Sequence, residues 1–424
     1  MKLFSDWIDV AAAVAAALVL VPCAAAGTAA PPVEELVTQA LERSPSLSAL
    51  EARFAAAREM VAPAGALPNP MAETMLQNIG LDDYTVGSVD MSMLTVEVRQ
   101  DLLFHGKRAA ARERARAEVE VEAARLELAR RELVATVRVA YARLYAFDRE
   151  RETLLTATEL LDMLAETVGA RYAAGEAEQE AVIKAQLEGS RVAERLDDLV
   201  AERSRTVAGL NRLLDQRGGA PVGEVAQLPP ATFPEGPWEE LAASNGPNVA
   251  LAARAIEEAE RRLEVARLEL KPNLSAGAGL GYRGDLDPAL ILRFGVEIPF
   301  WREEKQKPAI RAAEHELEMA EAELRDTVAL ARAEAARLAA ERERADRQLL
   351  RYREAIVPQT SAAVDAARAS YLAGRGDFST VVEDFELWLE ARAELARREA
   401  ERFQVWAEVE ALVTSAPVVE GDMP

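Results

Sequence analysis

The sequence predicts an α+β membrane protein, because two different periodicities alternate along the chain and the whole pattern occurs twice. Short segments in which every second residue is apolar precede very long segments with an apolar residue at every seventh position. A period of two indicates β-strands, and a period of seven indicates helices packed as in a coiled coil. Tyr172 and Gly175 recur 199 positions later as Tyr371 and Gly374, so each half of the chain holds one copy of the pattern.

The long helices are predicted first from what they lack. No glycine or proline occurs between Gly106 and Gly169, and one helix over that span would be about 90 Å long at ~1.5 Å per residue. The seven-residue spacing is kept in both halves: Val119, Leu126, Leu133, Ala140, Phe147, Leu154, Leu161 and Val168 in the first, and Ile310, Leu317, Leu324, Ala331, Leu338, Ala345 and Tyr352 in the second. This spacing predicts close packing between neighbouring helices.

Each long helix should end at glycine and reverse into a second helix. The predicted returning helices run from about Glu178 to Leu214 and from about Asp377 to Val413. Pro358 interrupts the second long helix and should kink or break it near Val357, because proline lacks the N–H and clashes with the preceding turn. The result is one helical hairpin in each half.

Four segments of about ten residues have the strand pattern, and this is the length that crosses a membrane as a tilted strand. The apolar positions are Leu94, Val96 and Val98 in one segment, Leu274 to Tyr282 in another, and Leu290 to Phe300 in a third. Met71–Ile79 is a fourth candidate with poor alternation. Aromatic residues close two of the segments, at Phe104 and at Phe300–Trp301, as at a membrane interface. A soluble sheet with one polar face would show the same alternation.

Four strands cannot close a barrel, and open sheet edges are not tolerated in lipid, so several subunits must combine. Six of the residues between the apolar positions are polar, as the wall of a water-filled lumen requires. They are Thr95, Glu97, Arg99, Ser275, Arg293 and Glu297. Gly277, Gly279 and Gly281 should ease curvature or close approach of other groups.

The composition excludes several classes of function. A net charge of −22 argues against a nucleic-acid partner, which needs clustered Lys and Arg. Only His105 and His315 are histidines, and there is no CxxC, no Ser/His/Asp set and no metal-ligand cluster. We therefore expect neither an enzyme nor a cofactor.

The chain divides into five predicted parts. Residues 1–30 read as a signal peptide, with Lys2 before an apolar run and Ala24–Ala26 after it. The two repeats occupy 31–215 and 237–413, with a linker at 216–236 and a tail at 414–424. Cys23 is a candidate for lipidation, and the alternative is cleavage after Ala26 or Ala30, which discards it. Either way the mature chain has no disulfide.

Several motifs together resemble the TolC-like outer-membrane efflux channels, and among them the group that serves heavy-metal efflux. The motifs are Ala66–Pro70, Gln100–Arg108, Ala355–Gln359, and the pairs Tyr172/Gly175 and Tyr371/Gly374, in an order that covers about Pro31 to Val413. The resemblance implies a homotrimer with 12 strands in the outer-membrane lipid and 12 helical columns in the periplasm. It also implies docking of the hairpin ends onto a periplasmic adaptor protein and an inner-membrane pump of the resistance-nodulation-division type.

The resemblance further implies site residues at the hairpin ends. Tyr172, Gly175, Tyr371, Gly374 and Arg375 would form the docking tip. The two acidic gate positions of the family fall on Thr380 and Glu383, and only Glu383 matches in charge.

The residues themselves also predict an acidic tip, because Asp377, Glu383 and Asp384 follow the second glycine. Threefold rings of carboxylates would favour cations. Acids in the first turn of a helix, where they cap free N–H groups, are the alternative explanation, above all for Asp377. We assign Thr380, Glu383 and Asp384 to the expected gate.

The predicted function is a passive export duct across the periplasm and outer membrane, for heavy-metal cations. Drug or solvent efflux and type I secretion use similar ducts and stay open as alternatives. A soluble periplasmic coiled-coil scaffold or adaptor is the alternative from another class.

Overall fold

The structure, a computed structural model, describes residues 29–79, 85–87, 89 and 91–413. Its elements, in chain order, are α1 (Val33–Arg43), α2 (Pro45–Ala64), β1 (Met71–Gln77), β2 (Met93–Leu102), α3 (Lys107–Ala173), α4 (Gln179–Leu213), α5 (Trp238–Asn245), α6 (Pro247–Leu268), β3 (Asn273–Arg283), β4 (Leu286–Glu297), α7 (Gln306–Arg351), the π-helical turn η1 (Tyr352–Ile356), α8 (Val357–Leu372) and α9 (Phe378–Val413). The order of two short helices, two strands and a long helical hairpin occurs twice.

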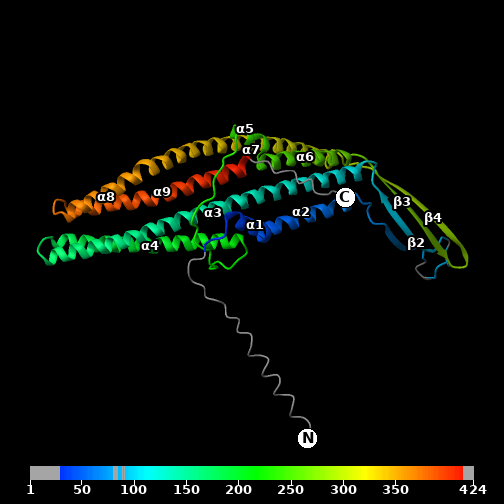
Figure 1. Ribbon diagram of the computed structural model, residues 1–424. Coiled ribbons are helices and arrows are strands. Elements are labelled where there is room, and N and C mark those ends of the chain that lie inside the picture. Colours follow the sequence, from blue (N-terminus) through cyan, green and yellow to red (C-terminus); the bar gives the residue numbers. More distant parts are fainter. Residues whose placement is uncertain (1–28, 80–84, 88, 90, 414–424) are drawn as a thin grey trace, which may run out of the picture.

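The molecule is long and curved, with the strands at one end and both hairpin turns at the other (Figure 1). Its helices form four columns. α2 and α4 follow one another along α3, and α6 and α9 follow one another between α3 and the column of α7, η1 and α8. The four columns match the number predicted for each subunit.

α3 is one uninterrupted helix of 67 residues, as the absence of glycine and proline before Gly169 predicts. Its heptad positions face other helices: Leu126, Leu133, Leu154, Leu161 and Val168 are all buried. These side chains belong to three separate apolar clusters spaced along the bundle. Burial of the apolar stripe is the main stabilisation of such a helix.

The disturbance predicted near Val357, a kink or a break, takes the form of a π-helical turn that ends at Ile356, and the helix does not break. The second long helix continues past Pro358, and the disturbance lies one turn earlier, in the π-helical turn Tyr352–Ile356. There the Val357 N–H donates to the Tyr352 carbonyl, five residues back. Since Pro358 has no N–H and its ring crowds the carbonyl four residues before it, the ladder widens by one residue instead of ending.

The four strands form one antiparallel sheet in the order β1-β2-β3-β4, which confirms the four predicted strands. β2 and β3 are neighbours although the whole first helical hairpin separates them in sequence. The sheet therefore joins the two repeats. β4 ends at Glu297, three residues before the end of the predicted alternation at Phe300.

Residues 216–236, between the two repeats, lie against the helices. Asp148 of α3 is almost fully buried, accepts from Arg203 Nε at 2.7 Å and accepts from the Val225 N–H at 2.8 Å. The Trp406 indole N–H donates to the Thr232 carbonyl at 2.9 Å. These contacts fix the segment to helices of both halves, around the middle of the bundle.

Candidate functional site

One face of the sheet is apolar and open to solvent in the single chain. Its most exposed strand residues are Phe294 and Leu290 of β4, at 81% and 69% of their full accessible surface, followed by Leu280 of β3 at 62%. The register places Val96, Leu280 and Leu290 side by side across three strands on this face. A continuous apolar surface of this kind requires a cover, either lipid or another chain.

The opposite face of the sheet is polar and more enclosed. Thr95 and Glu97 are both buried, and Glu97 forms an ion pair with Arg293 at 2.9 Å. Gly277, Gly279 and Gly281 lie on this face, and an added Cβ at each would come within 3.0 Å of a β2 atom. The predicted close approach at the glycines is thus confirmed, and so is the placing of the polar set opposite the apolar face.

The two outer strands of the sheet each have one neighbour within the described residues. β1 pairs only with β2, and β4 pairs only with β3, so both keep a row of unpaired backbone groups. Such edges must be paired before a sheet can lie in lipid. The chain on its own supplies no further strand in the part that the structure describes.

The part of the chain that the structure describes lacks two features. None of the helices is both long and apolar enough to cross a membrane. Groups of three or more His, Cys, Asp or Glu side chains that could hold a metal ion are also missing from this part of the chain.

The structure brings all five predicted tip residues to the end of the bundle that lies opposite the sheet (Figure 1). Gly175 and Gly374 follow the ends of α3 and α8 with φ of +76° and +69°, a conformation that glycine adopts without strain. The following N–H groups, of Glu176 and Arg375, donate back to carbonyls five residues earlier. The glycines are therefore needed to close both hairpin turns.

Arg171 links the two hairpins at the tip. Its Nη1 donates to the Tyr371 carbonyl at 2.6 Å, and its guanidinium lies 4.8 Å from the centre of the Tyr371 ring. The Tyr371 ring packs edge-on against Phe378, and burial raises the pKa of its hydroxyl. Tyr172, by contrast, is half exposed. The two equivalent tyrosines thus have different surroundings, and sequence spacing alone did not reveal this.

The predicted gate residues lie in the first two turns of α9. Thr380 and Glu383 are exposed and Asp384 is half-buried, and within the described ranges neither acid forms an ion pair. Lys184 of α4 donates to Ser379 at 2.7 Å, and its hydrogen bond with Glu180 raises the pKa of its ammonium group. A cavity of about 640 Å³ lies between the hairpins, lined by Arg171, Lys184 and several acids.

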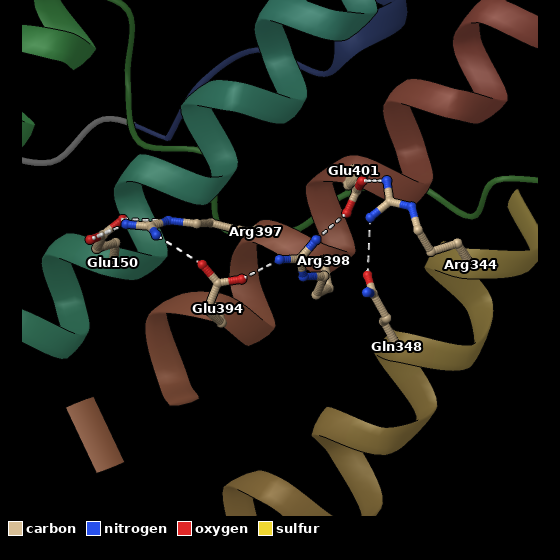
Figure 2. A network of polar contacts seen from close by, with 7 residues as sticks. All are labelled: Glu150, Arg344, Gln348, Glu394, Arg397, Arg398 and Glu401. Carbon is tan, nitrogen blue, oxygen red and sulfur yellow. Dashed lines mark hydrogen bonds and ion pairs between the residues drawn. The ribbon is translucent and has the colours of Figure 1, made fainter. Parts of the chain in front are cut away.

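A charged network in the middle of the bundle was not predicted. Figure 2 shows Arg397 of α9 holding Glu150 of α3, while Arg398 links Glu394 to Glu401 and Glu401 reaches Arg344 of α7. Arg397 donates three hydrogen bonds to Glu150, at 2.8, 2.9 and 3.3 Å, and Glu150 is almost fully buried. The network therefore ties α3 of the first repeat to α9 and α7 of the second.

The remaining sequence prediction, lipidation of Cys23, falls outside the described residues. His105, at the junction of β2 and α3, is exposed.

Comparisons with known proteins agree with this architecture. The sequence model of the outer membrane efflux protein family matches residues 36–216. A search of curated protein sequences gives no significant match. Several solved structures match nearly the whole chain, at a sequence identity of 20% or less.

Three of the matching structures are outer-membrane or transmembrane channel proteins. The outer membrane protein VceC of Vibrio cholerae is 20% identical with a TM-score of 0.78, over 90% of this chain and 96% of its own. The transmembrane channel protein CusC is 16% identical with a TM-score of 0.78, over 92% and 95%. The open state of the MtrE outer membrane channel of Neisseria gonorrhoeae is 16% identical with a TM-score of 0.76, over 91% and 89%. In sequence, the first half of the chain matches the outer membrane efflux protein family, and in structure nearly the whole chain has the fold of outer-membrane channels.

Proposed function

We propose that the protein is the outer-membrane channel of a tripartite efflux system, a passive duct across the periplasm and outer membrane. The observation that carries the proposal is the sheet, which exposes an apolar face, hides a polar one and leaves both edges unpaired. Three copies would supply 12 strands, enough to close a barrel with a wet interior. The four helical columns of each copy would continue the duct into the periplasm.

Fractionation of cells and analysis of the purified protein test this proposal. We expect the protein in the outer membrane, as a trimer that resists detergent until heated, and as a conducting pore in planar bilayers. An epitope inserted at the β3–β4 turn, at Gly284–Asp285, should be reached by antibody on intact cells. A stable, water-soluble monomer in the periplasm would contradict the proposal and favour the scaffold alternative.

The hairpin end is proposed as the docking tip for a periplasmic adaptor protein, which binds in turn to an inner-membrane pump of the resistance-nodulation-division type. Tyr172 and Arg375 are exposed there, and Gly175 and Gly374 shape the turns. Cysteine-specific crosslinking from Tyr172→Cys and Arg375→Cys should capture the adaptor, and from the control Met60→Cys on exposed α2 it should not.

Thr380, Glu383 and Asp384 are proposed to line the gate of the duct. The support is their place on the first turns of α9 and the absence of ion pairs for the two acids within the described chain. Glu383→Ala should raise the resting conductance of purified trimers in planar bilayers. An unchanged conductance would remove Glu383 from the gate.

Heavy-metal cations are the proposed cargo, with drugs, solvents or secreted proteins as the alternative. The support is the acidic character of the tip, since rings of carboxylates favour cations. Deleting the gene should sensitise cells to divalent or monovalent metal ions. Sensitivity confined to drugs or detergents would contradict metal cations as the cargo, but it would not contradict the proposed channel.

A further inference from the structure

An ion pair on the polar face of the sheet crosses a whole strand. Glu97 is on β2 and Arg293 is on β4, with β3 between them. In the strand register, Arg99 of β2, Gly277 of β3 and Arg293 of β4 form one row. The Glu97 carboxylate reaches over this row, and its Oε1 lies 2.9 Å from Arg293 Nε.

The glycines of β3 make this bridge possible. A Cβ at Gly277 would lie 2.7 Å from Glu97 Oε1, and a Cβ at Gly279 would lie 2.9 Å from Glu97 Cα. Both distances are shorter than real contacts of a Cβ atom allow. A Cβ at Gly277 would displace the Glu97 carboxylate, and a Cβ at Gly279 would push against the backbone of β2 at Glu97. The bridge thus depends on Gly277 and Gly279, the glycine strip, because the Glu97 side chain lies directly on their backbone.

The bridge also decides which charges this face presents. The Glu97 side chain is 5% exposed, while the Arg293 side chain is 49% exposed. Arg99, the other arginine of the row, lies 3.7 Å from Asp101. Each guanidinium of the row therefore has one carboxylate nearby, and loss of Glu97 would leave the half-exposed Arg293 guanidinium without an ion-pair partner among the described residues.

We propose that the Glu97–Arg293 bridge over the glycine strip sets the charge selectivity of the barrel lumen, and that Glu97 keeps this row from attracting anions. The inference rests on the proposed function, because the polar face becomes a lumen only in a closed barrel. Trimeric symmetry would repeat the row three times around the wall, and rings of charged side chains govern which ions pass.

Reversal potentials of purified trimers in planar bilayers, under a potassium chloride gradient, test the proposal. Glu97→Gln should shift the potassium-to-chloride permeability ratio towards chloride by at least about twofold, and Arg293→Gln should shift it towards potassium by a similar factor. The double variant Glu97→Gln/Arg293→Gln keeps the row balanced and should lie near the wild type. Arg302→Gln, beyond the end of β4, is the matched control and should change nothing.

A second measurement separates the barrel from the tip. Adenosine triphosphate, a multivalent anion, added on the side of the β3–β4 turn reaches the barrel before it reaches the tip. It should block current through Glu97→Gln at a concentration at least about tenfold below that needed for the wild type, because three free guanidiniums would hold its phosphates. Gly277→Ala retains both charges but places a methyl group where the Glu97 carboxylate lies. It should lower the blocking concentration by a smaller factor than Glu97→Gln.

Shifts in the same direction for Glu97→Gln and Arg293→Gln, or no shift in either, would overturn the inference while the trimers still conduct. Failure of the wild type to form conducting trimers would instead contradict the proposed function.

Discussion

At the scale of single residues, Arg171 carries the clearest consequence. It joins the two hairpins through the Tyr371 carbonyl and ring. Arg171→Ala should weaken this connection by about 1–3 kcal/mol, the range of a charge-assisted hydrogen bond. Hydrogen exchange of the tip amides in the purified protein should then speed up by roughly tenfold for each ~1.4 kcal/mol.

Arg375→Ala is the control for this prediction, because Arg375 is exposed at the same tip. Equal exchange in both variants would show that the Arg171 contacts do not hold the hairpins together.

Asp148 gives a second prediction at this scale. Asp148→Ala leaves the Arg203 guanidinium and the Val225 N–H without their buried acceptor. Removing one partner of a buried ion pair costs about 3–5 kcal/mol, so the midpoint of thermal unfolding should fall by several degrees. Asp365→Ala removes a 73% exposed acid that lies 3.8 Å from Arg368, and should leave the midpoint unchanged. A small effect at Asp148 would mean that the other contacts of residues 216–236, such as the Trp406–Thr232 hydrogen bond, are enough to hold the segment.

The residues that the sequence predicted and those that it did not differ in a physical way. Tyr172, Gly175, Tyr371 and Gly374 repeat, and so they could be placed at equivalent turns. Arg171 and Asp148 could not be singled out among the 122 charged residues, because their partners lie far away in sequence and surface charges have the same local pattern. Only packing of the two hairpins shows which charges are buried.

At the scale of elements, the π-helical turn before Pro358 predicts an unusual response to substitution. Proline in a helix interior costs about 3 kcal/mol relative to alanine. Pro358→Ala should nevertheless stabilise the protein by less than ~1 kcal/mol, because removing the extra residue would rotate α8 by about 100°. Val364 and Tyr371 of α8 are buried, and this packing opposes the rotation.

Equilibrium or kinetic unfolding of the Pro358→Ala variant measures the effect. A gain near 3 kcal/mol would mean that the turn relaxes freely and that the packing of α8 adapts to it.

The contact between α4 and α9 predicts a dependence on pH. Burial, together with the nearby Glu386 carboxylate, raises the pKa of Glu188 above its ordinary 4.5. The folded state then binds this proton more tightly than the unfolded state, so the free energy of unfolding falls as pH rises through the window between 4.5 and the raised value. Glu188→Gln should therefore be more stable than the wild type at neutral pH.

That advantage should shrink as the pH approaches 4.5, in thermal midpoints measured across the acidic range. Glu386→Gln should reduce the same pH dependence by removing the neighbouring charge. A constant difference between Glu188→Gln and the wild type at all pH values would contradict the assigned cause.

The elements themselves could be predicted well, because strong periodicity fixed them. Seven-residue spacing gave α3 and α7, and two-residue spacing gave β2, β3 and β4. β1 has poor alternation in sequence, and its pairing along the regular edge of β2 defines it in the structure. The π-helical turn could not be predicted, since proline indicates a disturbance but not whether the helix stops or widens.

At the scale of the whole molecule, the start of the described chain bears on Cys23. The Ala30 N–H donates to the Glu224 carbonyl, and Glu224 lies 3.8 Å from Arg149 of α3. Arg149 is about 63 Å along α3 from Lys107, where the helix leaves the sheet. The six residues from Cys23 to Ala29 can span only ~20 Å when extended.

In the proposed orientation, an acyl chain on Cys23 could not reach the outer membrane. We expect no incorporation of labelled palmitate into the mature protein and an unchanged location for Cys23→Ala, with a lipoprotein of the same cells as positive control. Labelling that Cys23→Ala abolishes would contradict this expectation.

The outer edges of β1 and β4, which have no neighbouring strand within the described residues, also have a consequence for biogenesis. β4 has 12 residues and β1 has seven, so the outer edge of β4 is the longer of the two. Before β4 pairs with a strand of a neighbouring copy, this edge can form backbone hydrogen bonds with other unfolded chains. Copies made without export should accumulate as aggregates rich in intermolecular β-structure. If the chain assembles as proposed, a periplasmic chaperone that shields Leu286–Glu297 should therefore raise the yield of closed barrels.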